Sequence, residues 1–147
     1  MAHTDIDHSG PWATPPHILL VDDDSALLDA LPDAIRHRVP GTIVKTATRA
    51  DDALASCEAE EFDAIITDLC MPSHDGVMLL TRLLALRPDI PVLLISGQAD
   101  ERARKEAIRL GAYAFLNKPL DPDFMAELLK QAILQRRLHL LPPRCAA

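Results

Sequence analysis

Short apolar segments alternate along the chain with stretches in which apolar residues recur at helical spacing. Most of the apolar segments are continuous rather than alternating, which is typical of strands buried on both faces of a sheet. The pattern predicts strands at 17–21, 42–47, 62–67, 91–96 and 112–117 and helices at 25–39, 50–61, 76–87, 100–111 and 121–141. Because strands and helices alternate, the predicted fold class is α/β, with a doubly wound five-stranded parallel sheet and five helices.

Two of the predicted helices have unusual features. The helix at 25–39 has Asp24 or Ser25 as its N-cap, and Pro32 inside it predicts a kink or a short break. The helix at 100–111 has few apolar residues to bury: Ala103, Ala107, Ile108 and Leu110. We therefore expect that helix to be the least firmly held of the five.

The two ends of the chain differ in composition from its middle. Residues 1–16 are polar, proline-rich and aperiodic, which predicts a flexible N-terminal leader with Trp12 outside the core. The patterned region, 17–141, is predicted to be one domain, and 142–147 a frayed tail. The run QRRLH, 135–139, is typical of a solvated helix end, with a dimer or linker contact as the alternative.

Composition narrows the function. The chain has 147 residues, enough for one core, and a formal charge of −7, which argues against nonspecific nucleic-acid binding. Apolar runs fall short of the roughly 20 residues that span a bilayer, and no signal peptide is visible. The cysteines are odd in number and lack a C-x-x-C spacing, so we expect reduced thiols: Cys57, Cys70 and Cys145. A cytoplasmic protein without direct nucleic-acid or membrane contact is predicted.

Polar residues gather where the predicted strands end. In a doubly wound sheet, ligands bind outside the carboxyl ends of the strands, so these residues should converge on one edge. They are Asp22, Asp23 and Asp24 after the first strand, Asp68 at the third, Ser96 at the fourth and Lys118 at the fifth.

This set of side chains suggests a metal-assisted phosphoryl chemistry. Two carboxylates ~4 Å apart repel by roughly 4 kcal/mol at an effective dielectric constant of ~20, so either their pKa values rise or a cation lies between them. Mg²⁺ fits best, because it prefers hard oxygen ligands and binds beside phosphate groups. A carboxylate there can attack phosphorus and form an aspartyl phosphate, with Lys118 and the Ser96 hydroxyl contacting the phosphoryl oxygens.

Four motifs occur in an order and at spacings that identify a family: ILLVDDD (18–24), TDLCMPSHDG (67–76), LLISG (93–97) and FLNKP (115–119). With these motifs, residues 17–138 resemble the receiver domain of response regulators in two-component signal transduction. The resemblance implies a flavodoxin-like, CheY-like fold with strand order 2-1-3-4-5.

The resemblance also assigns roles around the acidic residues. It implies that Asp68 is the phosphoacceptor, that Asp22 and Asp23 are the acidic pair that binds Mg²⁺ with it, and that Asp23 is the preferred direct ligand. The backbone carbonyl of Cys70 would complete the protein's share of the metal shell. The residue at this position influences phosphoryl lifetime in the family. A thiol there is less suited than an amide to orient the attacking water, which predicts a tendency to a long-lived phosphorylated state. Gln98 is a residue that can compensate for the missing amide.

Three more positions match residues that sense the phosphoryl group in the family. Lys118 matches the phosphate-binding lysine, whose bond to Pro119 is cis in the family. Ser96 matches the switch hydroxyl, and Phe115 the aromatic switch residue. The implied mechanism is a two-state shift in which phosphorylation moves the hydroxyl and the ring.

The implied function is a phosphorylation-dependent signalling switch. A sensor histidine kinase or a histidine phosphotransfer protein would donate the phosphoryl group, and the face built from 100–111, 112–117 and 121–141 would change its preference for a downstream protein effector. A homodimer through that face is a further expectation. Such a domain catalyses only its own phosphoryl transfer and hydrolysis, so it is not an enzyme in the usual sense. A stand-alone receiver, a phosphorelay shuttle and a part of a longer regulator remain open.

A rival reading belongs to another class of protein. Asp22 and Asp24 form the D-x-D pattern of Mg²⁺-dependent phosphatases of the haloacid dehalogenase type, which would use Asp22 as nucleophile. Ala26 stands where that family wants Thr or Val, and no cap domain is evident. The nucleophile discriminates the two readings, since the receiver needs Asp68.

Overall fold

The structure is a computed structural model that describes residues 12–71, 74–97 and 101–139. Some predictions fall outside the described residues: those on residues 1–11 of the leader, on Gln98, on 140–141 at the end of the last helix, and on the tail at 142–147 with its Cys145.

A five-stranded sheet forms the centre of the molecule. Its strands are β1 (His17–Val21), β2 (Ile43–Ala47), β3 (Ala64–Asp68), β6 (Val92–Ser96) and β7 (Ala114–Asn117). They run in the order β2-β1-β3-β6-β7 and every neighbouring pair is parallel, which confirms the predicted topology. A two-stranded antiparallel hairpin, β4 (Cys70–Met71) and β5 (His74–Asp75), follows β3 and was not predicted.

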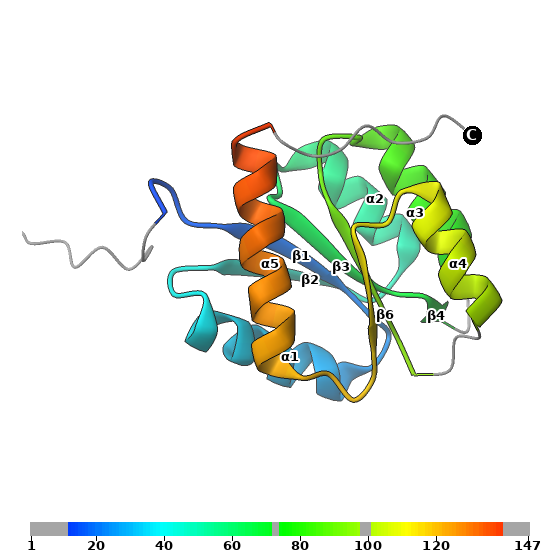
Figure 1. The fold of residues 1–147 in the computed structure, drawn as a ribbon, viewed down its shortest axis with the longest axis horizontal. Helices are drawn as coiled ribbons and strands as arrows, with labels where there is room; N and C mark the ends of the chain where they lie inside the picture. The colour runs from blue at the N-terminus through cyan, green and yellow to red at the C-terminus, as the bar shows by residue number, and fades with distance from the viewer. Residues whose placement is uncertain (1–11, 72–73, 98–100, 140–147) are drawn as a thin grey trace, which may run out of the picture.

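Five helices cover the two faces of the sheet, as predicted: α1 (Ser25–Arg38), α2 (Ala50–Ala59), α3 (Gly76–Leu86), α4 (Glu101–Leu110) and α5 (Pro122–Arg137). Leu19 and Val21 of β1 pack in one core cluster with residues of α2, α3 and α4, while Ile18 and Leu20 pack in a second cluster with residues of α1 and α5. Figure 1 shows α5 on one side of the sheet and α2 on the other. Alternate residues of one strand therefore feed two cores. None of these helices has the length and apolar character needed to cross a membrane. The cytoplasmic location stays a prediction.

Helix α1 is held at its start by a cap and in its middle by packing. The Asp24 carboxylate accepts hydrogen bonds from two backbone N–H groups of the first turn, so Asp24 rather than Ser25 is the N-cap. The helix continues through Pro32, so the predicted short break is wrong. Leu31, Pro32 and Ile35 are buried, and this packing holds the helix although proline cannot donate a backbone hydrogen bond.

Helix α4 buries little, as the sequence predicted. Ala107 is its one fully buried side chain, whereas Ile108 is 47% exposed. Burial of Ile108 was therefore predicted wrongly, because consecutive helical residues point about 100° apart and Ala107 already takes the inward direction.

The segment before β1 lies against the domain. Trp12, predicted to lie outside the core, is partly buried and packs against the core cluster of α1 and α5. The Pro16 carbonyl accepts a hydrogen bond from the Ile43 N–H at 2.8 Å, which continues the pairing of β1 with β2.

Candidate functional site

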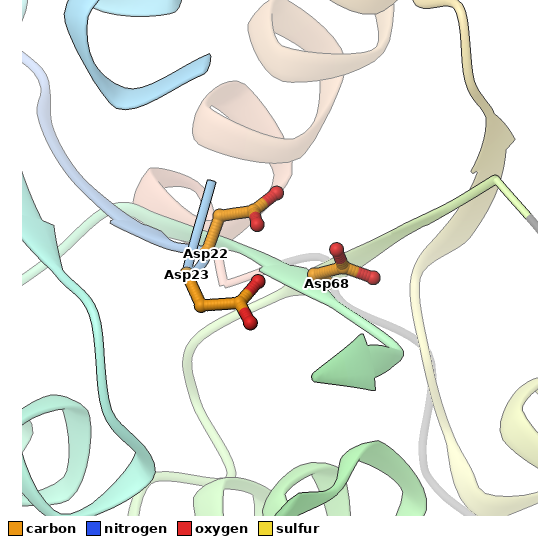
Figure 2. A group of neighbouring side chains, drawn as sticks. All are labelled: Asp22, Asp23 and Asp68. Carbon is orange, nitrogen blue, oxygen red and sulfur yellow. The ribbon is translucent and has the colours of Figure 1, made fainter. Parts of the chain in front are cut away.

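Three carboxylates meet at the carboxyl edge of the sheet. Asp22 follows β1, Asp23 is the next residue, and Asp68 is the last residue of the neighbouring strand β3. Each offers an oxygen that lies within 4.8 Å of the others. Figure 2 shows Asp22 and Asp23 side by side, with their carboxylates directed toward Asp68. The predicted convergence of Asp22, Asp23 and Asp68 is thus present in the structure.

The three consecutive acids after β1 have different surroundings. Asp22 is 0% exposed, and its Oδ1 accepts a hydrogen bond from the Asp24 N–H at 2.9 Å. Asp23 is exposed and contributes to the carboxylate cluster from the solvent side. Asp24 faces away to cap α1. One acid of the run is thus structural, as a capping role requires, and two belong to the site.

Lys118 bridges the two buried carboxylates. Its Nζ donates to Asp68 Oδ2 at 2.8 Å and to Asp22 Oδ2 at 3.0 Å. Its backbone N–H donates to the Ser96 carbonyl at 2.8 Å, which places it beside β6, and its bond to Pro119 is cis. Burial alone would lower the pKa of the Lys118 amine, but the hydrogen bonds and charges of the two carboxylates outweigh burial and raise that pKa.

Asp68 is held at both carboxylate oxygens. It is 4% exposed and ends a strand whose residues are all buried. The Cys70 N–H donates to its Oδ1 at 2.8 Å, while Oδ2 accepts from Lys118. The side chain is therefore oriented by groups from two different segments, strand β4 and the residue that follows β7.

The chain after Asp68 returns closely on itself. A Cβ atom at Gly76 would lie 2.0 Å from the Leu69 carbonyl oxygen, so only glycine fits at the start of α3. Gly76 is thus structural, as predicted from the Asp75–Gly76 pair. This backbone contact closes the hairpin that contains Cys70.

Ser96 and Phe115, the two predicted switch residues, have different environments. Ser96 is 2% exposed, and its Oγ lies 3.4 Å from the Cys70 Sγ, beside the acidic cluster. Phe115 is partly buried and packs against the core cluster of α2, α3 and α4. The guanidinium carbon of Arg104 lies 5.9 Å from its ring centroid. Ser96 thus contacts Cys70, while Phe115 packs in the adjoining layer, and the switch roles of both residues stay predictions.

The charges of the site do not cancel. Three carboxylates surround one ammonium group, which leaves two negative charges when all the acids are ionised. A divalent cation that prefers oxygen ligands would balance them. The residues present therefore fit Mg²⁺.

A second cluster lies at the amino edge of the sheet, and the sequence reasoning missed it. Asp63, just before β3, accepts from Arg137 at 2.9 and 3.0 Å and from the His17 N–H at 2.9 Å. The side chains of Arg136 and Arg137 are 18% and 22% exposed, so the prediction of a solvated helix end at 135–139 is wrong for these two residues. Leu138 and His139 are exposed, as predicted. The acid within the apolar run FDAIIT was the available signal.

A sheet that gathers carboxylates and a lysine at its carboxyl edge defines a class of α/β phosphoacceptor modules. Residues 18–130 match the response regulator receiver domain, and the chain belongs to that family. It is 35% identical over 123 residues to the C4-dicarboxylate transport transcriptional regulatory protein DctD of Rhizobium meliloti, covering 84% of this chain and 26% of that protein. It is 37% identical over 126 residues to the transcriptional regulatory protein PrrA of Mycobacterium tuberculosis, covering 84% of this chain and 52% of that protein.

Solved structures show the same likeness. A CheY-like receiver domain protein from Methanospirillum hungatei matches with a TM-score of 0.78 and 29% identity, covering 84% of this chain and 98% of that one. A response regulator from Burkholderia pseudomallei matches with a TM-score of 0.72 and 27% identity, covering 84% of this chain and 72% of that one. That structure was solved with a phosphorylated aspartic acid, a calcium ion and citrate.

These findings establish the general function. The chain is a receiver domain, a phosphoacceptor signalling module of two-component systems rather than an enzyme that turns over a substrate. Receiver domains work with histidine kinases. The phosphatase hypothesis gains no support, because the family match over residues 18–130 covers the five-stranded sheet except for His17, the first residue of β1. The chain spans about a quarter to a little over half the length of the curated relatives that it matches.

Proposed function

We propose that this protein is a phosphorylation-dependent switch in which Asp68 accepts a phosphoryl group from a sensor histidine kinase or a histidine phosphotransfer protein. The observation that carries the proposal is the shared lysine: Lys118 contacts Asp68 and Asp22 within a cluster that also contains Asp23. The Burkholderia relative, whose structure contains a phosphorylated aspartic acid, supports the same chemistry.

The reaction follows from the groups present. A carboxylate oxygen of Asp68 forms a bond to phosphorus while the bond from phosphorus to the donor imidazole nitrogen breaks, and the electron pair of that bond returns to the nitrogen. Lys118, which already donates to Asp68, stays within reach of the new phosphoryl oxygens as a compact positive charge. Hydrolysis later transfers the phosphoryl group to water and regenerates the carboxylate.

Mg²⁺ is the proposed cofactor. The carboxylates of Asp22, Asp23 and Asp68 and the backbone carbonyl of Cys70 would hold it, with exposed Asp23 as the most accessible ligand. When bound, the ion offsets negative charge on the phosphoryl oxygens. The charge imbalance of the cluster supports this assignment.

The output is proposed to pass through the face of α4, β7 and α5. Ser96 would donate a hydrogen bond to the phosphoryl group, and Phe115 would change its packing in response. The small buried surface of α4 supports a helix that can shift. The partner would be a downstream protein effector, and a homodimer through this face is an alternative. Light scattering with and without beryllofluoride tests the homodimer, which an unchanged mass would exclude.

Intact mass after incubation with acetyl phosphate and Mg²⁺ tests the acceptor. We expect one phosphoryl group on the wild type, none on Asp68→Asn and none after EDTA. Asp51→Asn is a matched control, because Asp51 is an exposed acid in the first turn of α2 and its loss should leave the adduct intact. An adduct that persists in Asp68→Asn would contradict the proposal. So would a wild type that forms no adduct and shows no beryllofluoride binding by NMR.

A further inference from the structure

Cys70 contacts two residues of the site through different atoms. Its backbone N–H donates to Asp68 Oδ1 at 2.8 Å, and its Sγ lies 3.4 Å from Ser96 Oγ. We propose that the Cys70 thiol holds the Ser96 hydroxyl before phosphorylation, so that Cys70 is a positioning residue that sets how readily the site accepts a phosphoryl group. This inference rests on the proposed function and deepens it.

The backbones on both sides of this contact are fixed. Ser96 ends β6, pairs in register with Asn117 of β7, and accepts the Lys118 N–H at its carbonyl. Cys70 lies in β4, whose preceding residue Leu69 donates its N–H to the Ile95 carbonyl at 2.9 Å. The Ser96 hydroxyl can therefore change partner mainly by rotation about χ1, among three staggered positions.

The strength of the contact follows from sulfur chemistry. A thiol is a weak hydrogen-bond donor and a weak acceptor, so the hold on the Ser96 hydroxyl is weaker than a hydroxyl at position 70 would provide. A phosphoryl oxygen on Asp68 is a charged acceptor and offers a stronger bond than the thiol. When the Ser96 side chain rotates toward Asp68, its hydroxyl must leave the Cys70 thiol. It then forms a stronger hydrogen bond to the phosphoryl oxygen.

This role differs from an effect of position 70 on hydrolysis. A residue that governs access of water to the phosphoryl group changes the lifetime of the phosphorylated state. A residue that holds Ser96 changes the affinity of the site for a phosphoryl group or its mimic, and it acts only while the Ser96 hydroxyl is present. A double-mutant cycle between Cys70 and Ser96 separates the two roles.

The experiment is a beryllofluoride titration in the presence of Mg²⁺, followed by NMR, on the wild type, Cys70→Ser and Cys70→Ala. Each variant is also made in a Ser96→Ala background. Because one neutral hydrogen bond changes, we expect Cys70→Ser to weaken beryllofluoride binding about two- to tenfold and Cys70→Ala to strengthen it by less. In the Ser96→Ala background the three residues at position 70 should bind equally.

Two further measurements distinguish the proposed role of Cys70 from a general effect of its substitution on the structure. The affinity for Mg²⁺ alone should be the same in all Cys70 variants, because the proposed metal ligand there is a backbone carbonyl. Cys57→Ser is the matched control: it makes the same chemical change at a buried position in α2, so it should lower the melting temperature without changing beryllofluoride affinity.

Two outcomes would overturn the inference alone. The first is equal affinity of the wild type and Cys70→Ser. The second is a difference that persists in the Ser96→Ala background, since position 70 would then act directly on the bound group. A wild type that binds no beryllofluoride and forms no phosphoryl adduct would instead overturn the proposed function, and the inference with it.

Discussion

Strand β3 has a buried aspartate at each end, and the two are neutralised differently. Asp63 precedes the strand and is 6% exposed, while Asp68 ends it and is 4% exposed. At about 3.3 Å per residue the two lie roughly 17 Å apart, at opposite edges of the sheet. The two aspartates are therefore similarly buried, but they differ in how many positively charged groups surround them.

The acids at the amino edge have matching cations. The amino-edge cluster consists of Glu61, Asp63 and Asp89 with Arg87, Arg136 and Arg137. Arg137 binds Asp63 through two nitrogens, and Arg136 bridges Asp63, Glu61 and Asp89. Hydrogen bonds from Arg87 lower the pKa of Asp89 to about 2. Charges of both signs are equal in number, and the cluster needs no ion.

The acids at the carboxyl edge have only Lys118 as a cation among the described residues of the site. This difference teaches that burial alone does not mark a functional carboxylate. An uncompensated negative charge is the better marker, because it favours the binding of a cation at that edge.

The largest effect on stability is expected when a cation of the amino-edge cluster is removed. Arg137→Met leaves buried Asp63 with weaker compensation, so unfolding free energy should fall by about 3 kcal/mol. Urea denaturation measures the loss. Arg36→Met is the control, because Arg36 pairs with Asp33 on the surface and should matter by less than about 0.5 kcal/mol. Equal losses in the two variants would contradict the structural role of the amino-edge cluster.

The second largest effect on stability is expected when Mg²⁺ neutralises the carboxylates at the carboxyl edge. Mg²⁺ at one hundred times its dissociation constant should add about 2.7 kcal/mol to the stability of the wild type. The same denaturation series with and without Mg²⁺ measures the gain. Arg137→Met should keep the gain, whereas Asp23→Asn should lose most of it, since it removes an exposed ligand. A gain that survives in Asp23→Asn would place the ion elsewhere.

A smaller effect of opposite sign is expected without metal. Asp23→Asn removes one of three mutually repelling carboxylates, so metal-free stability should rise by about 1 kcal/mol. Asp51→Asn removes a charge that favours the start of α2, and it should lower stability by about 0.3 kcal/mol. Thermal unfolding in EDTA at low salt compares the stabilities of the two variants. A loss of stability in Asp23→Asn would contradict the predicted repulsion among the three carboxylates.

The smallest effect concerns pH. Burial would raise the pKa of Asp63, but the hydrogen bonds from Arg137 and His17 outweigh it and lower that pKa. The stability that Asp63 provides is therefore complete above its unfolded pKa of about 3.9 and is lost as the pH falls through the lower folded pKa. Asp63→Asn should show a shallower loss of stability below pH ~4.

Lys118 acts at the other end of the pH scale. Its pKa is raised in the fold, so its contribution is complete below its unfolded pKa of about 10.4 and is lost as the pH rises through the folded value. Denaturation of Lys118→Met above pH ~10 should show a shallower loss than in the wild type. If the unfolding free energy changed with pH at the same slope in the wild type and in a variant, the contribution assigned to the residue replaced there, Asp63 or Lys118, would be contradicted.

The sheet and the convergence at its carboxyl edge were predictable because both follow from regular features. Continuous apolar runs predict buried parallel strands, and parallel strands bring their carboxyl ends to one edge. The hairpin β4–β5 was not predictable, since strands of two residues leave no period in the sequence.

The amino-edge cluster and the contact between Cys70 and Ser96 were missed for another reason. Asp63 and Arg137 are 74 positions apart, and a basic helix end is more often solvated than paired. Cys70 and Ser96 are 26 positions apart and meet only because β3 and β6 are neighbours. Side-chain pairings of this kind depend on rotamers that a sequence pattern does not carry.

The position of Trp12 has a practical consequence for spectroscopy. It is the chain's only tryptophan, and the guanidinium carbon of Arg137 lies 5.5 Å from its ring centroid, at the amino edge. Intrinsic fluorescence will therefore report release of the N-terminal segment from α5, and it will respond little to events around Asp68. An optical probe of the acceptor site needs a second fluorophore, and the native one serves as an internal reference for the opposite edge.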